Sequence, residues 1–235
     1  MININNFPDE ILTHILSFLP IKDAFRTTIL SKKWQHLCHS LSVLNIDDEG
    51  QDNIIYWTHF RQFMNAVMLC PCSQYITLKS FHLTCDYDLW DAKAECFSLN
   101  TWIKAAKQRR IEYLNLDLFE VLLIPTTLFC CKTLVVLKLT NMSVAKMYRC
   151  SVDLPSLKTL DLDRVSFHDM ENLMRLISGC PILENLTTLF VETRTGLTVG
   201  GYFKPLSKLI KANIHSFVVP LRALSNVQFL TIFEV

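Results

Sequence analysis

The chain has 235 residues, of which half are hydrophobic and 19% are charged, and its 23 basic and 22 acidic residues nearly cancel. A sequence this rich in apolar residues can bury a large core, which excludes a disordered chain. The basic residues form no tail or stripe, so nucleic acid and membrane are not expected partners. The longest apolar runs are far shorter than a membrane span, and the first residues do not read as a secretory signal.

The cysteines are nine in number and irregularly spaced. Because the number is odd and no export signal is recognisable, we interpret them as reduced thiols and expect a location in the cytoplasm, the nucleus or both. Cys70 and Cys72 form a lone pair, and the group His36, Cys38 and His39 lacks a second pair at zinc-finger spacing. We therefore expect no metal site.

Catalytic motifs are also missing from the sequence. It contains no phosphate-binding loop, no zinc-protease helix and no nucleophile elbow. We read the glycine cluster Gly196–Gly201 as a connecting loop, since it contains no basic residue. The sequence thus predicts no catalytic residue and no cofactor, and a chain that is not itself an enzyme.

The first predicted helix begins at Pro8, whose ring suits a helix start, and the carboxylates of Asp9 and Glu10 follow where the helix dipole favours them. Pro20 ends it. Its apolar residues form one broad stripe at helical spacing, namely Ile11, Leu12, Ile15, Leu16 and Leu19.

Two further short helices are predicted in the next twenty residues. The second runs from Asp23, as its cap, to Ile29, and it should bury Ala24, Phe25, Ile29 and Leu30. The third follows Ser31 and carries Trp34, which we expect in the core, with Leu37 and Cys38. A unit of this size rarely folds alone, and its first helix is apolar over a wider arc than two short neighbours can cover. Part of that arc should therefore face a partner.

Residues 4–45 resemble an F-box, the domain by which receptor subunits of cullin-based (SCF-type) ubiquitin ligases dock on a small acidic adaptor. The resemblance rests on Phe7-Pro-Asp-Glu-Ile-Leu-Thr-His-Ile-Leu-Ser-Phe-Leu-Pro20 and on Leu30-Ser-Lys-Lys-Trp34, with Phe7 where leucine is usual. It implies that the adaptor, of the S-phase kinase-associated type and bound in turn to a cullin, contacts a surface built by Pro8, Ile11, Leu12, Ile15, Leu16, Leu19, Lys33 and Trp34. We expect Leu12→Asp to abolish adaptor binding without unfolding the rest of the chain.

Beyond this unit the pattern apolar-x-x-apolar-x-apolar recurs, which indicates leucine-rich repeats over residues 46–235. Clear copies start at Ile111, Leu134 and Leu157, and weaker ones at Leu41, Leu78, Leu183, Leu209 and Val227. Helical segments are predicted between them: one after Asn53, one capped by Asn100, and one capped by Asp169 and stopped at Gly179. The predicted fold is α/β: a three-helix F-box followed by an irregular solenoid with a curved parallel sheet.

The repeats are similar to the divergent leucine-rich repeats of plant F-box/LRR/FBD proteins. The similar stretches are Leu83–Asp88, Trp102–Ala106 and Ser178–Glu184. Members of that family often continue into an FBD region, whereas this sequence ends within a predicted strand and shows no polar cap. We therefore expect a truncated or shortened form that lacks the FBD region, with an open strand edge that favours aggregation.

The outward positions of the best strands are the candidate contacts for a target protein. They are Asn115, Asp117, Lys138, Thr159 and Asp161. The sequence and the resemblance together predict a substrate receptor that brings an unidentified target to the ligase, so that proximity rather than chemistry by this chain promotes ubiquitination. Two alternatives stay open: a non-degradative scaffold or decoy, and a small-molecule receptor that uses the repeat face.

Overall fold

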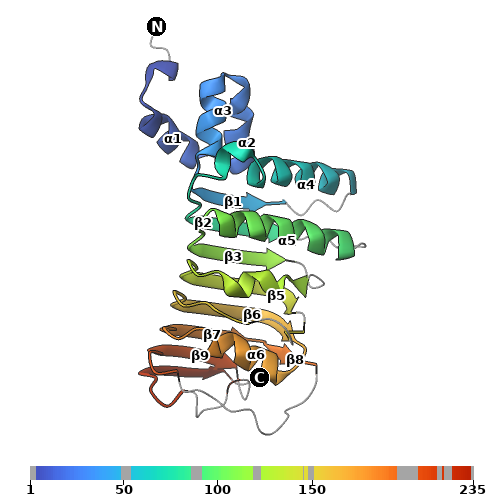
Figure 1. The fold of residues 1–235 in the computed structure, drawn as a ribbon, viewed down its shortest axis with the longest axis vertical. Coiled ribbons are helices and arrows are strands. Elements are labelled where there is room, and N and C mark those ends of the chain that lie inside the picture. Colours follow the sequence, from blue (N-terminus) through green and yellow to red (C-terminus); the bar gives the residue numbers. More distant parts are fainter. Residues whose placement is uncertain are drawn as a thin grey trace.

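The computed structural model describes residues 4–48, 54–85, 92–118, 123–144, 146–147, 151–194, 206–215, 219 and 224–233. Three short helices lie at one end of the molecule, at its N-terminus (Figure 1). They are α1 (Asp9–Ser17), α2 (Ile21–Arg26) and α3 (Lys32–His39), with the 3-10 turns η1 (Ile4–Asn6) and η2 (Thr27–Ile29). Pro8 is the N-cap residue of α1, and Pro20 is the N-cap residue of α2. The second helix therefore starts before Asp23, which had been expected to cap it.

A ten-stranded sheet, parallel in every pair, forms the rest of the fold. Its main strands follow chain order: β1 (Val43–Asp47), β2 (Ser80–Cys85), β3 (Tyr113–Leu118), β5 (Val136–Val144), β6 (Thr159–Phe167), β7 (Asn185–Leu189), β9 (Lys211–His215) and β10 (Phe229–Phe233). Two short strands, β4 (Leu123–Ile124) and β8 (Glu192–Thr193), pair with β5 and β6. Each of the eight copies of the apolar motif is thus a strand, and the predicted solenoid is confirmed.

The register of the strands explains why the motif repeats. Leu114, Leu137, Leu160 and Leu186 are paired neighbours in successive strands, and all of them are buried. Alternate residues of a strand point to opposite faces, so stacking the motifs builds a continuous apolar row on one face. Thr188 occupies a leucine position in the next row and is fully buried there.

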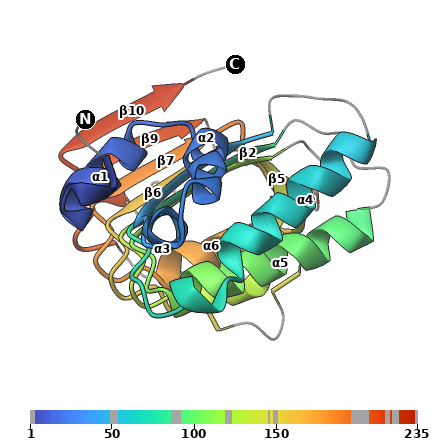
Figure 2. The same cartoon turned by 90° about the horizontal axis from the view of Figure 1, so that it is seen from above.

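In the part of the chain that the structure describes, the helices of the repeat region cover one face of this sheet, as the view along the solenoid shows (Figure 2). They are α4 (Ile54–Met68), α5 (Ala92–Gln108) and α6 (Met170–Ser178), with the turns η3 (Pro71–Ser73) and η4 (Thr126–Cys130). Asp169 caps α6 as predicted, because its carboxylate accepts a hydrogen bond from the Asn172 amide, and Gly179 ends that helix. The predicted cap at Asn100 is wrong, since α5 begins at Ala92 and Asn100 lies inside it.

Three successive strands bend at the same register position. Asn141, Arg164 and Phe190 have φ angles of 55°, 50° and 48°, a left-handed conformation that is uncommon for residues other than glycine. Asn141 follows Thr140, Arg164 follows Asp163 and Phe190 follows Leu189, and Asp163 pairs with both Thr140 and Leu189. Pairing resumes on the far side, where Met142 lies beside Val165. The left-handed positions therefore align across β5, β6 and the residue that follows β7.

Candidate protein-interaction surfaces

Helix α1 presents an apolar ridge to solvent. The ridge consists of Ile11, Ile15, Phe18 and Leu19, whose side chains are 47%, 38%, 74% and 39% exposed. Ile11 and Ile15 are one helical turn apart on α1, Phe18 is the C-cap residue of that helix, and Leu19 follows it. Four large apolar side chains exposed so close together are typical of a protein-binding surface.

The opposite side of α1 packs inward. Leu12 and Leu16 are fully buried in the core that also includes Trp34 and Leu37 of α3. These two leucines were predicted as adaptor-facing or supporting residues, and only the supporting role fits their burial. Leu12→Asp would therefore place a carboxylate in the core of the helical unit, so loss of adaptor binding in this variant would not report on a direct contact, and its effect on the rest of the chain stays a prediction.

Lys33 and Trp34 of α3 hold the segment that enters α1. The Lys33 ammonium donates to the carbonyls of Asn5 and Phe7 at 3.0 and 2.9 Å, and it lies 3.1 Å from the Asp9 carboxylate. The Trp34 indole N–H donates to the Asn5 side-chain oxygen at 2.7 Å. Trp34 is buried, as expected, and both residues orient α1 from behind, whereas Pro8 is exposed at its start.

A second exposed apolar pair follows α2. Ile29 and Leu30 were predicted to be buried, but they are 87% and 58% exposed. The reason is that η2 replaces the last turn of the expected helix, which changes the side on which these residues lie. Phe18 was not predicted as a surface residue, although it continues the spacing of Ile11 and Ile15 by one more turn.

The sheet face opposite the helices, which we call the open face, carries polar side chains in register. Asn115, Lys138 and Asp161 are paired neighbours on β3, β5 and β6. Asp117 lies two residues after Asn115 on β3, and Thr159 lies two residues before Asp161 on β6, so both are on the same face as these neighbours. All five predicted target-contact residues are partly exposed on this one face.

Charges on the open face influence one another. The Lys138 ammonium lies 3.8 Å from the Asp161 carboxylate. Burial raises the pKa of Asp161, Lys138 opposes that shift, and the nearby Asp163 adds to it. On β2 the ring of His82 stacks on Tyr113 at 4.7 Å, and burial followed by the charge of Lys138 lowers the pKa of His82.

A chain of polar contacts follows the shared bend beside these residues. The Asn141 amide donates to the Asp117 carboxylate at 2.9 Å, and the Arg164 Nε–H donates to the Asn141 oxygen at 2.7 Å. Arg164 also lies 3.3 Å from the Asp163 carboxylate. Asn141 and Arg164 therefore place their side chains where they link Asp117 on β3, across β5, to Asp163 on β6. The sequence contained no signal for this link, because nothing in it shows that Asn141 and Arg164 share a register.

A groove of about 660 Å³ separates α2 from α4. Phe25, Tyr56, Phe60 and Phe63 line it, with Pro20, Lys22, Asp23, Arg26 and His59 around them. Lys22 donates to the Tyr56 hydroxyl at 2.6 Å, and Arg26 pairs with Asp23 at 2.7 Å. The small-molecule alternative had placed a pocket on the repeat face, whereas this groove lies at the junction with the helical unit.

The side chains that could bind a metal ion are spread over the molecule. Within the described residues no group of three or more histidine, cysteine or acidic side chains lies close enough together to hold a metal ion. Free thiols are present at Cys38, Cys70, Cys72, Cys85, Cys130, Cys131 and Cys180, and burial raises the pKa of Cys180 to about 12. Among the described helices none is both long and apolar enough to cross a membrane. The glycine cluster at 196–201 lies outside the described residues.

Comparison with known proteins agrees with this division of the chain. Residues 4–45 match the F-box domain, and residues 99–199 match the leucine-rich repeats described for FBD-associated F-box protein At5g56370. The chain is an F-box protein with leucine-rich repeats of the FBD-associated type, so the predicted resemblance is confirmed.

Curated relatives extend the similarity over most of the chain. The putative FBD-associated F-box protein At5g56410 of Arabidopsis thaliana is 34% identical over 83% of this chain and 41% of its own length. The F-box/LRR-repeat protein At3g59200 of the same plant is 33% identical over 79% of this chain and 36% of its own length. The chain thus spans about two fifths of the length of these relatives.

Proposed function

We propose that this protein is a substrate-recognition subunit of an SCF-type ubiquitin ligase. In this proposal the F-box docks the adaptor, and through it the cullin, while the open face of the sheet holds a target protein. The chain supplies no catalytic group. It raises the effective concentration of target lysines near the charged ubiquitin carrier.

The α1 ridge is the observation that carries the proposal. Ile11, Ile15, Phe18 and Leu19 expose apolar surface although Leu12 and Leu16 on the same helix are buried. Leaving such surface in water is unfavourable by about 25 cal/mol per Å² of apolar area, so a partner that covers the ridge gains that free energy. Lys33 and Trp34 fix the direction of α1, which preorganises the ridge for binding.

The adaptor assignment is tested with Ile11→Asp. Ile11 is exposed, so the substitution should leave the circular dichroism spectrum unchanged and weaken binding of a purified S-phase kinase-associated-type adaptor at least tenfold, because a carboxylate at the interface must be desolvated. Leu123→Asp is the matched control, since Leu123 is 45% exposed on β4 of the repeat region. Equal adaptor affinity of the two variants would refute the assignment of this surface.

Target binding is tested separately on the open face. Lys138→Glu reverses the charge opposite Asp161 and should remove proteins that co-purify with the wild type when the proteasome is inhibited, while adaptor binding persists. Overexpression distinguishes receptor from decoy: a receptor lowers the level of its target, and a decoy raises it. We also propose, from the reduced thiols and the ligase role, that the protein works in the cytoplasm or nucleus.

A further inference from the structure

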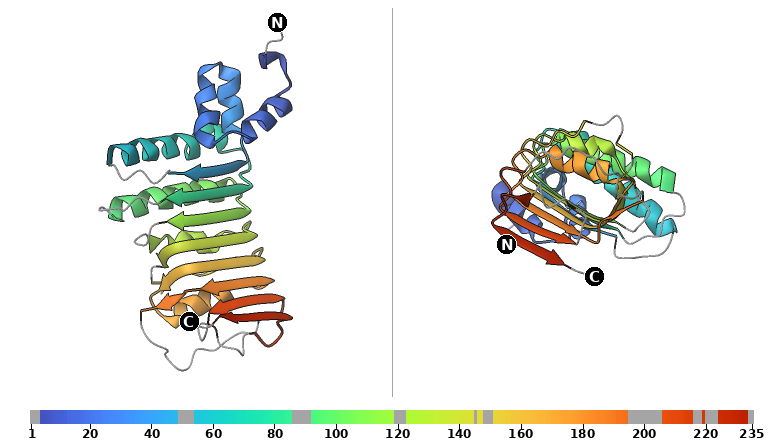
Figure 3. Two further views of the ribbon diagram at one scale, coloured as in Figure 1. Left: turned by 180° about the vertical axis from the view of Figure 1, so that it is seen from behind. Right: turned by 90° about the horizontal axis from the view of Figure 1, so that it is seen from below.

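Two thiols lie in the connection between α4 and β2, close to the F-box. Cys70 caps the 3-10 turn η3, Cys72 is part of that turn, and α3 of the F-box lies against it. Figure 3 shows the F-box helices at one end of the strands, next to the teal helix α4 that leads into this connection. Cys70 is partly exposed and Cys72 is exposed, so small molecules in solution can reach the pair.

The backbone of this turn holds the two cysteines at a distance that a disulfide can span. Because Pro71 between them is the first residue of η3, their Cα atoms are about 5.5 Å apart, and disulfides span about 4.4–6.8 Å. The amide and the hydroxyl of the buried Ser73 both donate to the Cys70 carbonyl, at 3.0 and 2.9 Å, which fixes the turn. The sulfur atoms are also close, since a hydrogen bond joins the two thiols.

The surrounding charges give the two thiols different roles. The hydrogen bond to Cys70 raises the pKa of Cys72, and a negative charge on Cys70 raises it further, so Cys72 keeps its proton while Cys70 is ionised. The buried guanidinium of Arg109 is held in place by the carbonyls of Leu41 and Ile76. Burial lowers the pKa of Arg109, and the charge of Cys70 opposes that shift. A fixed cation favours a thiolate near it, and the thiolate is the nucleophilic form of cysteine.

We propose that Cys70 and Cys72 are a redox modification site, at which hydrogen peroxide oxidises Cys70 first and the pair then forms a reversible disulfide. The Cys70 thiolate attacks one peroxide oxygen, so an S–O bond forms, the O–O bond breaks, and the departing hydroxide takes up a proton to become water. The Cys72 sulfur then attacks the sulfur of the resulting sulfenic acid, and the hydroxyl group leaves with the Cys72 proton as a second water. Two thiols and one peroxide thus give one disulfide and two waters.

A second cysteine pair in the same chain lacks this arrangement. Cys130 and Cys131 are adjacent in sequence, but the Cys130 thiol donates to the Thr127 carbonyl at 3.5 Å, whereas the Cys131 sulfur lies 3.6 Å from the Thr133 hydroxyl. Cys131 is also buried. Peroxide should therefore select Cys70 and Cys72 over this pair. The selection depends on the turn alone and not on binding of an adaptor or a target.

Tryptic peptides of the 235-residue chain test the site directly. Residues 62–79 form one peptide that contains Cys70 and Cys72 and no other cysteine, and residues 111–132 form the control peptide that contains Cys130 and Cys131. The reduced protein is treated with hydrogen peroxide, remaining thiols are blocked with N-ethylmaleimide, and the peptides are analysed by mass spectrometry. The first peptide should lose two hydrogens and escape alkylation about ten times as often as the control, and glutathione should restore both thiols.

Single substitutions test the order of the two steps. Cys72→Ser should stop the reaction at a sulfenic acid on Cys70, which a 1,3-dione probe traps, whereas Cys70→Ser should leave Cys72 mostly reduced at the same peroxide dose. Circular dichroism of both variants should match that of the wild type. The proposal would be overturned by complete alkylation of both cysteines in the wild type, by equal disulfide content in the two peptides, or by a disulfide that joins two chains. Equal trapping of sulfenic acid in the two variants would overturn it as well.

Discussion

Arg109, which directly follows α5, donates a hydrogen bond to the carbonyl of Leu41, which lies 68 residues earlier near the end of the F-box. The two atoms are 3.1 Å apart, and the Arg109 Nε–H also donates to the Ile76 carbonyl at 3.0 Å. The side chain is only 3% exposed, and burial lowers its pKa. One buried guanidinium thus joins the helical unit to the first two repeats.

Loss of this contact should loosen the junction. We expect Arg109→Met to lower the free energy of unfolding by about 2–3 kcal/mol, because a charged donor is lost and two buried carbonyls lose their partner. Urea denaturation followed by circular dichroism measures this. Lys104→Met is the control, since Lys104 is exposed on the same helix and should change stability by less than about 0.5 kcal/mol. Equal effects of the two variants would contradict the role of Arg109.

The two sides of α1 should respond differently to truncation. Leu12→Ala should destabilise the protein by about 2–5 kcal/mol, since it opens a cavity in the core. Ile11→Ala should stay within about 0.5 kcal/mol, because its side chain is half-exposed. Thermal unfolding of both variants decides this, and a similar loss in each would mean that α1 is packed differently.

Asp161 should oppose folding at neutral pH. Its folded-state pKa is raised, so above that pKa the folded protein holds a carboxylate that burial disfavours. Stability from this group is therefore greatest below the pKa of an unfolded aspartate and decreases as pH rises through the higher folded pKa. We expect Asp161→Asn to raise the melting temperature at pH 7 and to lose this advantage near pH 3.

A matched aspartate controls for general charge effects. Asp153 also lies 3.8 Å from a lysine, Lys132, but its side chain is half-exposed. Asp153→Asn should leave the melting temperature nearly unchanged at both pH values. A rise in both variants, or in neither, would remove burial as the cause of the Asp161 effect.

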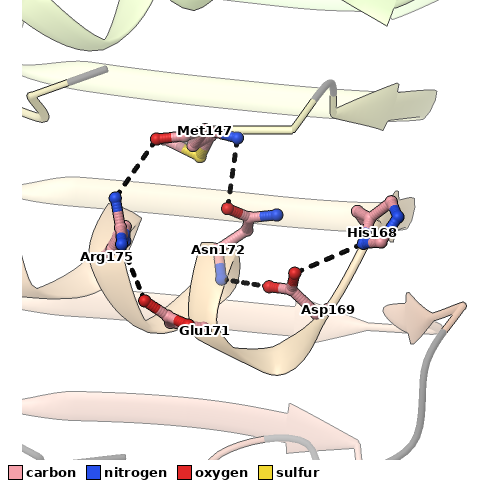
Figure 4. A network of polar contacts seen from close by, with 6 residues as sticks. All are labelled: Met147, His168, Asp169, Glu171, Asn172 and Arg175. Carbon is pink, nitrogen blue, oxygen red and sulfur yellow. Dashed lines mark hydrogen bonds and ion pairs between the residues drawn. The ribbon is translucent and has the colours of Figure 1, made fainter. Parts of the chain in front are cut away.

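Asn172 of α6 forms a hydrogen bond to Met147, in the segment that connects β5 to β6 (Figure 4). Its side-chain oxygen accepts a hydrogen bond from the buried Met147 amide at 3.2 Å, and Arg175 donates to the Met147 carbonyl at 3.2 Å. Asn172→Ala leaves that amide without a partner, so we expect a loss of about 1–3 kcal/mol in chemical denaturation. Glu171→Ala removes only an exposed pair with Arg175 and should cost less than about 0.5 kcal/mol.

The sequence predicted the strands well because each copy of the motif carries its own period-2 apolar pattern. Leu137 and Leu160 reveal a buried face without any knowledge of their neighbours. The start of α5 was missed because Asn100 is a good cap in isolation, whereas in the fold its side chain accepts a hydrogen bond from Thr127 at 3.1 Å.

The surfaces were harder to predict than the strands. Ile11 and Leu12 are adjacent apolar residues, and only the packing of α1 on α3 decides which of them is buried. Ile29 and Leu30 look like core residues from their hydrophobicity alone, because a sequence does not show the point at which a helix tightens into a 3-10 turn. The bend at Asn141, Arg164 and Phe190 depends on register between strands, which one repeat does not encode.

Strand β1 belongs to both parts of the molecule. It begins at Val43, within the segment that matches the F-box, and ends at Asp47, beyond it, while pairing along its length with β2. The F-box and the repeats are thus joined by a shared strand rather than by a flexible linker. Under the function proposed above, this fixes the distance between the adaptor and a bound target, so moving a lysine to another site on the target should change its modification without altering its capture.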